Sequence, residues 1–177
     1  MKLGLIGNGA IAHFVQQHLE QRGHSIDAML LRPERVLAQR LNGCSGPVLA
    51  AGVAELPEGL DHIIDCAGHE ALRDHGADIL RAGYDLTTVS IGALADQDLA
   101  AALEEAACAG GSTLHLASGA IGALDALRAG TVGGIASVRY IGRKPPKGWI
   151  GSPAEQQLDL QNMTGDAQTH FLGSARQ

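Results

Sequence analysis

The sequence predicts an α/β fold with a doubly wound parallel sheet, followed by the beginning of a second α+β domain. Short apolar runs alternate with segments of helical spacing from the amino terminus to about residue 118. Glycines stand where several of the helical segments end. Strands that alternate with helices favour a parallel sheet covered on both faces and connected by right-handed crossovers. This pattern is typical of a Rossmann-type sheet.

The first elements form a β-α-β unit. A strand is predicted over Lys2–Ile6, and a helix over Ala10–Arg22, which Gly23 ends. A second strand is predicted over Ile26–Leu31, so that the unit has the length of a β-α-β module, about 30 residues. A helix follows over Pro33–Leu41, with proline at a first helical position that it suits.

The same alternation continues to residue 118 and then weakens. Strands are predicted around Val48 and over His62–Asp65, Leu86–Ile91 and Thr113–Leu116, with helices over Glu70–Ala82 and Asp96–Ala109. Beyond residue 118 we expect a helix over Gly119–Ala129 and a strand over Val138–Ile141. The remaining residues are polar and too few to bury a core of their own.

A glycine-rich turn, GLIGNGAIA, follows the first strand. Gly7, Gly9 and Ala12 form a G-x-G-x-x-A arrangement at the start of the first helix. Gly7 permits the tight turn, Gly9 lets a pyrophosphate approach the backbone, and Ala12 allows close packing of helix and strand. Glycine-rich turns also occur in α/β proteins for packing alone. In this context the turn predicts that NAD or NADP binds here.

Arg32 directly follows the second predicted strand, at a position where an NAD-binding domain usually carries an acidic residue. An arginine at this position can accept the 2′-phosphate of NADP. Alternatively, Arg32 is a solvated residue at the start of a helix. With the glycine turn, these features predict a dinucleotide-binding domain over residues 1–118. Residues 119–177 are expected to supply a connecting helix and part of a substrate or dimerisation domain.

Two further segments, DCAGHEA and VSIGALAD, stand at the carboxyl ends of strands, where open parallel sheets bind their ligands. His69 could approach the nicotinamide ribose, but we favour a solvated imidazole at the start of a helix. Cys66 is interpreted as a small packed side chain, because the sequence places no base beside it that would lower the pKa of its thiol.

Composition argues against several other functions. The net charge of −6 and an aromatic content of 3% predict no nucleic-acid partner. No apolar run approaches the roughly 20 residues needed to cross a bilayer, and no signal peptide is evident, so a cytoplasmic protein is expected. The three cysteines form no Cys-x-x-Cys pair. The pairs His13/His18 and His69/His75 lack the spacing of one helical face, and no metal site is expected.

Several motifs together resemble one enzyme family. GNGAIA, DCAGHEAL, VSIGALAD, HLASGAIGALDALRAG and GRKPPKGW, in this order, are similar to the L-aspartate dehydrogenase family. The resemblance implies NAD(P)-dependent oxidation of L-aspartate to iminoaspartate, which gives oxaloacetate and ammonia or feeds NAD biosynthesis. It extends over essentially the whole chain, and SGAIGALDAL followed by GRKPP is its most specific part.

The resemblance also implies site residues. Cofactor contacts are expected at Gly7, Gly9, Ala10 and Ile11 in the turn, and at Ala120 on the nicotinamide side. The histidine that acts in catalysis in this family would lie beyond Gln177, so no catalytic residue is expected within the chain. The family's usual glycine is replaced by Ala12 in the first motif, a change that leaves the turn intact.

The segment GRKPPKGW is the candidate substrate-binding turn. Arg143, Lys144 and Lys147 could bind the carboxylates of aspartate, arginine in a bidentate manner. Alternatively, the segment is a solvated turn that Pro145–Pro146 holds in shape, with Trp149 packing the linker.

Two other functions remain open from the sequence. One is a non-catalytic dinucleotide-binding module. The other is a different two-domain dehydrogenase, such as a homoserine or semialdehyde dehydrogenase. The semialdehyde enzyme needs a reactive cysteine, and Cys108, within a predicted helix, is unsuited to that role. We also expect a homo-oligomer, a dimer, because an unpaired sheet segment and the exposed face of the helix over Gly119–Ala129 favour self-association.

Overall fold

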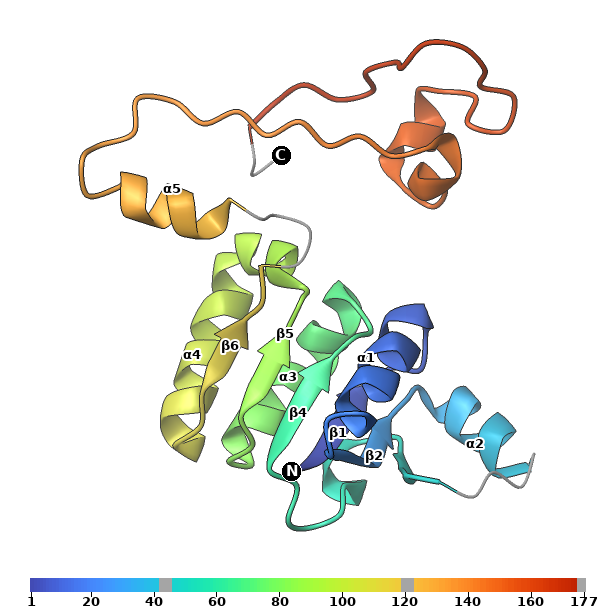
Figure 1. Cartoon of the computed structure of the whole chain (residues 1–177), viewed down its shortest axis with the longest axis vertical. Coiled ribbons are helices and arrows are strands. Elements are labelled where there is room, and N and C mark those ends of the chain that lie inside the picture. Colours follow the sequence, from blue (N-terminus) through green and yellow to red (C-terminus); the bar gives the residue numbers. More distant parts are fainter. Residues whose placement is uncertain (42–45, 119–122, 175–177) are drawn as a thin grey trace. The chain divides into compact units, whose positions relative to one another are not determined.

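Six parallel strands form one sheet in the computed structural model (Figure 1). In sheet order they are β3 (Val48–Ala50), β2 (Ser25–Leu30), β1 (Lys2–Ile6), β4 (His62–Asp65), β5 (Leu86–Thr88) and β6 (Leu114–Leu116). The strand order reverses between β1 and β4, which makes the carboxyl ends of these two strands the topological switch point. The structure describes residues 1–41, 46–118 and 123–174. The predicted Rossmann-type sheet is confirmed.

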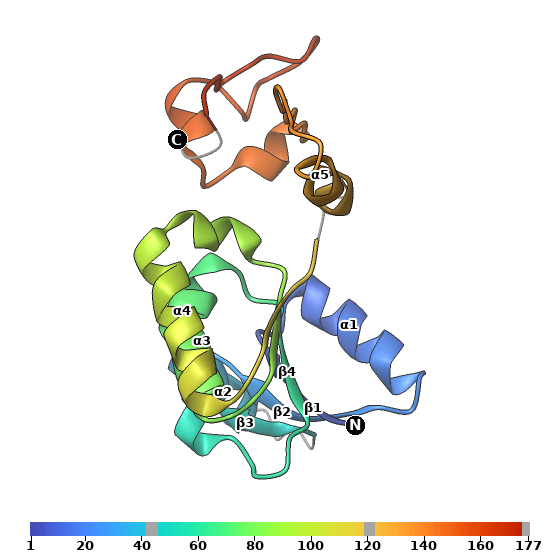
Figure 2. The same ribbon diagram turned by 90° about the vertical axis from the view of Figure 1, so that its left-hand side faces the viewer.

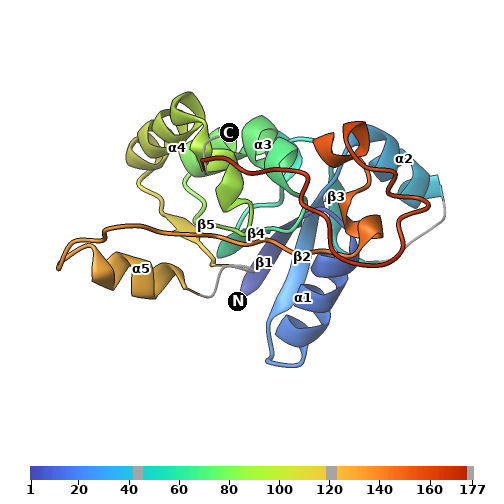
Figure 3. The same ribbon diagram turned by 90° about the horizontal axis from the view of Figure 1, so that it is seen from above.

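Helices cover both faces of the sheet. They are α1 (Ala10–Glu20), α2 (Pro33–Leu41), α3 (His69–Arg81) and α4 (Gln97–Gly110). In Figures 2 and 3, α1 lies on one side of the strands, and α3 and α4 lie on the other. Two apolar clusters fill these layers. One contains Leu5, Ala12 from α1 and Val36 from α2, and the other contains Leu72 from α3 and Leu103 from α4.

The helix α4 begins where its sequence predicts. The side chain of Asp96 accepts hydrogen bonds from the backbone N–H groups of Asp98 (3.2 Å) and Leu99 (3.3 Å). An acidic N-cap of this kind satisfies N–H groups that have no partner within the helix. Leu103 and Ala106 then face the sheet, buried against α3.

The strand predicted over Leu86–Ile91 is shorter than expected, because β5 ends at Thr88. The backbone N–H of Ser90 donates to the hydroxyl of Thr88 (2.9 Å), and this bond turns the chain out of the sheet. Residues Ile91–Ala95 then form a 3₁₀ helix that leads into α4. The prediction of a strand to Ile91 was therefore wrong.

The chain divides into two units, Met1–Leu124 and Asp125–Gln177. Helix α5 (Leu124–Gly130) begins within the helix predicted over Gly119–Ala129, whose first four residues lie outside the described part. The second unit also contains 3₁₀ helices over Pro146–Trp149 and Pro153–Gln156. Among the described residues, no helix has the length and apolarity to cross a membrane.

The strand predicted over Val138–Ile141 is wrong. These residues have no regular structure, and the exposed fractions of Val138, Tyr140 and Ile141 are 59%, 72% and 65%. A β-strand requires a neighbouring strand for its backbone hydrogen bonds, and the described residues of this unit provide none. Apolar alternation alone therefore did not determine the local structure.

Candidate functional site

The glycine turn joins β1 to α1 at the switch point of the sheet. Gly7 has a φ of +93°, and a Cβ built on it would lie 2.9 Å from the Cβ of Ala67. Its N–H donates to the carbonyl of Leu30 (2.9 Å), at the end of β2. Only glycine meets both the conformational and the packing requirement at this position. Gly7 therefore fits the turn against β2 and the segment after β4.

Gly9 is free of such packing. Its φ is −80°, and a Cβ built on it would have no heavy atom within 4 Å. Gly9 is the N-cap of α1 and provides no side chain to cap the first turn, in which Ala10 and Ile11 are exposed. Backbone N–H groups at an uncapped helix start attract anions, as does the positive end of the helix dipole. The open space above Gly9 fits the pyrophosphate of a dinucleotide.

A buried carboxylate fastens the two loops that follow β4 and β5. Oδ1 of Asp65 accepts from the N–H groups of Ala67 (2.9 Å) and Gly68 (3.4 Å). Oδ2 accepts from the hydroxyls of Thr88 (2.7 Å) and Ser90 (2.7 Å). Asp65, Thr88 and Ser90 are all buried. The network shapes the carboxyl edge of the sheet beside the glycine turn.

Asp65 was not among the predicted site residues, although it begins the segment DCAGHEA. A signal was present. An acidic residue ends one apolar strand, and two hydroxyl residues stand at the end of the next strand along the chain. Because parallel strands end at the same edge, such residues meet.

His69 begins α3 and is exposed, as the solvated interpretation predicts. Its ring nevertheless lies against the loop after β5. A Cβ built on Gly92 would be 2.9 Å from Cε1 and 3.0 Å from Nε2 of His69. The imidazole therefore stands at the carboxyl edge, where a role beside the nicotinamide ribose remains a prediction.

Cys66 lies directly after β4 and is buried. Burial, and to a lesser degree the charge of Asp65, raises the pKa of its thiol to about 11. The thiolate is the reactive form of cysteine, so Cys66 is suited to packing and unsuited to nucleophilic attack. This agrees with the interpretation of Cys66 as a small packed side chain.

Alkylation of the native protein should distinguish the two described cysteines. With iodoacetamide at about pH 8, we expect Cys66 to react about 100-fold more slowly than the exposed Cys108, because roughly one in a thousand Cys66 thiols is ionised. Peptide mass spectrometry at timed quenches gives both rates. In denaturant the two rates should converge. Equal rates in the native protein would contradict the buried, protonated state of Cys66.

Arg32 lies at the carboxyl end of β2, next to β1 in the sheet. Its side chain is 74% exposed, and Nε lies 3.4 Å from Oε1 of Glu34. Its carbonyl accepts from the N–H of Arg35 (2.9 Å) and thereby starts α2. An exposed ion pair of this kind contributes little free energy, so a phosphate could displace Glu34 from the guanidinium. Both interpretations of Arg32 are compatible with this geometry.

In the segment GRKPPKGW, Lys144 and Trp149 contact each other. Nζ of Lys144 lies 4.8 Å from the centroid of the Trp149 ring, and the ring of His170 packs edge-on against the same indole (4.5 Å). The hydroxyl of Ser152 donates to the carbonyl of Trp149 (2.6 Å) and closes the turn. Lys144 thus packs on the turn, and both Lys144 and Arg143 are exposed. Ala120 lies outside the described residues.

Both units match known families, and the identity to whole aspartate dehydrogenases shows which family the chain belongs to. Residues 3–117 match the NAD-binding domain of homoserine dehydrogenase, and residues 125–177 match the C-terminal domain of aspartate dehydrogenase. L-Aspartate dehydrogenase from Pseudomonas aeruginosa is 40% identical over 180 residues, covering 100% of this chain and 67% of that protein. The chain belongs to the L-aspartate dehydrogenase family. The family member from Ruegeria pomeroyi is 50% identical over 176 residues, which cover 99% of this chain and 62% of that protein.

The chain therefore spans about two thirds of the length of its aspartate dehydrogenase relatives. Among solved structures, aspartate dehydrogenase from Thermotoga maritima superposes with a TM-score of 0.54 at 22% identity, over 73% of this chain and 50% of that one. The WlbA dehydrogenase from Bordetella pertussis, solved with NADH and UDP-GlcNAcA, gives 0.55 at 14% identity, over 67% and 35%. At these identities the likeness supports the Rossmann fold.

Proposed function

We propose that the protein acts in the NAD(P)-dependent oxidation of L-aspartate to iminoaspartate. Membership of the L-aspartate dehydrogenase family supports the reaction. One observation supports cofactor binding above all. The space beside Gly9 is open, at an uncapped helix start that lies at the switch point of the sheet. A dinucleotide whose pyrophosphate bound there would supply its nicotinamide as the hydride acceptor.

The reaction moves one hydride and one proton. Oxidation would remove a hydride from Cα of aspartate and a proton from its amino group, so that a C=N bond forms, and a bound nicotinamide would supply the hydride acceptor. Hydrolysis of the imine then gives oxaloacetate and ammonia. In this chain, Gly7 shapes the turn, and the backbone at Gly9, Ala10 and Ile11 holds the pyrophosphate. The family resemblance assigns the nicotinamide side to Ala120.

Arg143 is the better candidate for a substrate carboxylate. Its guanidinium can bind a carboxylate through two parallel hydrogen bonds, and it is exposed. Lys144 already packs over Trp149 and would need to leave the ring to bind substrate. We therefore assign substrate binding first to Arg143, with Lys144 as a second cation.

The cysteine chemistry argues against a semialdehyde dehydrogenase. That reaction needs a thiolate beside the nicotinamide. The pKa of the Cys66 thiol is raised to about 11, and Cys108 lies in the last turns of α4, away from the carboxyl edge. Oxidation of homoserine is the alternative activity to be tested, because residues 3–117 match the NAD-binding domain of homoserine dehydrogenase.

Two measurements on the purified chain test the proposal. Calorimetry should show binding of NAD⁺ or NADP⁺, and absorbance at alkaline pH should show reduced cofactor that forms with L-aspartate and not with L-homoserine. Reduction with L-homoserine alone would identify a different dehydrogenase. Cofactor binding without turnover of either substrate would leave a dinucleotide-binding module. Absence of binding to both cofactors would remove the proposal altogether.

Arg32→Ala should separate the two cofactors. If the guanidinium holds the 2′-phosphate, we expect NADP⁺ binding to weaken by about 10-fold or more, the worth of a charge-assisted hydrogen bond, while NAD⁺ binding changes by less than about 2-fold. Arg35→Ala, which removes an exposed cation from the first turn of α2, is the matched control. Calorimetry with both dinucleotides gives the comparison. Unchanged binding of NADP⁺ by Arg32→Ala would assign Arg32 to the solvated role, and an equal loss for both cofactors would contradict a specific contact with the 2′-phosphate.

A homodimer, a cytoplasmic location and a contribution to NAD biosynthesis belong to the same proposal. Apolar side chains that stand exposed in the second unit, including Val138, Tyr140 and Ile141, support self-association. Light scattering of the purified chain measures the oligomeric state, and a monomer at micromolar concentration would contradict the dimer.

A further inference from the structure

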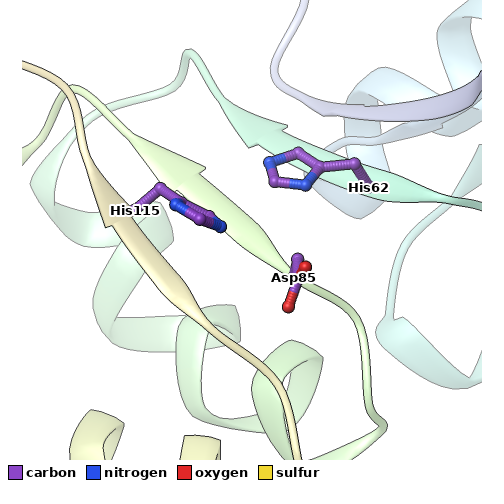
Figure 4. Close-up of side chains that lie close together, drawn as sticks. All are labelled: His62, Asp85 and His115. Atoms are coloured by element: carbon purple, nitrogen blue, oxygen red, sulfur yellow. The ribbon is translucent and has the colours of Figure 1, made fainter.

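Three side chains with metal-binding chemistry converge on one face of the sheet. Figure 4 shows His62, Asp85 and His115 pointing toward a common space. One ligand atom from each residue lies within 4.8 Å of one from each of the others. They come from the first position of β4, the residue before β5 and the middle of β6.

The strand register explains why they meet. Thr87 pairs with Ile64 on one side and with His115 on the other. Paired residues of parallel strands point to the same face, and so do residues two apart on one strand. His62 and Asp85 are each two residues before a member of this row. All three side chains therefore stand on the face of the sheet that carries Leu5 and the α1 cluster.

We propose that His62, Asp85 and His115 bind a divalent transition-metal ion, best represented by Zn²⁺. Two imidazoles and one carboxylate form a ligand set that suits zinc and its neighbours in the first row of transition metals. Three protein ligands leave a fourth position for water. Mg²⁺ and Ca²⁺ prefer all-oxygen sites and should bind much more weakly.

Two of the three ligands are already oriented by neighbouring groups. Nε2 of His62 lies 2.7 Å from the hydroxyl oxygen of Thr87. Oδ1 of Asp85 accepts from the backbone N–H of Thr113 (2.7 Å), which leaves its second oxygen for a metal. Such partners fix the ring and carboxylate orientation in natural metal sites. His62 and Asp85 are partly buried, so their positions are also limited by packing.

The third ligand has room to close the site. Tetrahedral zinc with bonds of about 2.0–2.2 Å brings its ligand atoms to roughly 3.3–3.6 Å from one another. The imidazole of His115 is exposed and lies 5.5 Å from that of His62, centroid to centroid, so a side-chain rotation can shorten the gap.

The site is separate from the dinucleotide site. His62 opens β4 and Asp85 precedes β5, whereas the glycine turn and the Asp65 network stand at the carboxyl ends of the strands. A bound ion would connect β4, β5 and β6 across the edge half of the sheet. Because only the folded chain brings these strands together, binding should stabilise the native state.

Zinc titration of the metal-free full chain tests the site. After dialysis against a chelator, calorimetry should give one Zn²⁺ per chain for the wild type. His115→Ala removes an exposed ligand and Asp85→Asn removes the charge, and each should weaken binding by at least about 10-fold. His13→Ala, an exposed histidine on α1, is the matched control and should bind like the wild type.

Thermal unfolding provides a second readout that guards against misfolded variants. Without metal, His115→Ala should melt like the wild type, because its side chain is exposed. With Zn²⁺, the melting temperature should rise equally for the wild type and His13→Ala, and by clearly less for His115→Ala. Equal zinc affinity in His115→Ala and the wild type would overturn the proposal, as would Mg²⁺ binding as tightly as Zn²⁺.

Discussion

Gly9→Ala is expected to weaken dinucleotide binding by at least about 10-fold while the free energy of unfolding changes by less than about 1 kcal/mol. A methyl group at Gly9 meets no protein atom within 4 Å, so its obstruction falls on the ligand. Alanine is a poorer N-cap than glycine, but it lowers the entropy of the unfolded chain, and these effects offset each other. Calorimetry and urea unfolding measure the two quantities.

Gly7→Ala is the matched control, because it places the same methyl group two residues earlier. There the residue must hold a φ of +93° with its Cβ 2.9 Å from that of Ala67. We expect a loss of about 2–4 kcal/mol in unfolding free energy, combining backbone strain with overpacking. If Gly9→Ala binds NAD⁺ and NADP⁺ as the wild type does, the turn serves packing and not the cofactor.

Asp65→Ala should produce the largest loss of stability, about 3–5 kcal/mol in the free energy of unfolding. The substitution removes the acceptor of four hydrogen bonds and leaves the buried hydroxyls of Thr88 and Ser90 without their partner. Asp65→Asn keeps the shape of the side chain but places an NH₂ donor among groups that already donate, so we expect an intermediate loss of unfolding free energy. Urea unfolding monitored by circular dichroism measures the series.

Asp78→Ala is the control for charge removal without burial. Asp78 is exposed on α3 and pairs with Arg81 at 3.2 Å, so its loss should cost less than about 0.5 kcal/mol. A loss below about 1 kcal/mol for Asp65→Ala would mean that the hydroxyls find other acceptors. In that case the Asp65 network would not be what holds the loops after β4 and β5.

The elements of the first unit could be predicted because local pattern and tertiary structure agree there. Lys2–Ile6 is an apolar run that becomes β1, Pro33 starts α2, and Asp96 caps α4. At Val138–Ile141 the same kind of pattern failed. Alternating apolar residues do not form a strand unless another strand accepts their backbone hydrogen bonds, and a partner is a property of the fold and not of the segment.

The proposed metal ligands His62, Asp85 and His115 likewise could not be predicted from the sequence alone. The spacings of His13/His18 and His69/His75 predicted no metal site, whereas His62 and His115 lie in β4 and β6 and Asp85 directly precedes β5. Neighbours across a parallel sheet are set by strand order and register, which depend on the crossovers between the strands. Spacing along the chain therefore carries no signal for such a cluster until the register is known.

The sequence by itself determined the Rossmann-type order of elements, the glycine turn and the family. Each of these is encoded in consecutive residues, such as the Gly7–Gly9 turn or the SGAIGALDAL segment. The tertiary structure alone decided that Gly7 is required for packing and Gly9 is open, that Asp65 fastens two loops, and that Lys144 packs on Trp149. These properties depend on which distant atoms surround a residue, and distance in space is set by the folded chain as a whole.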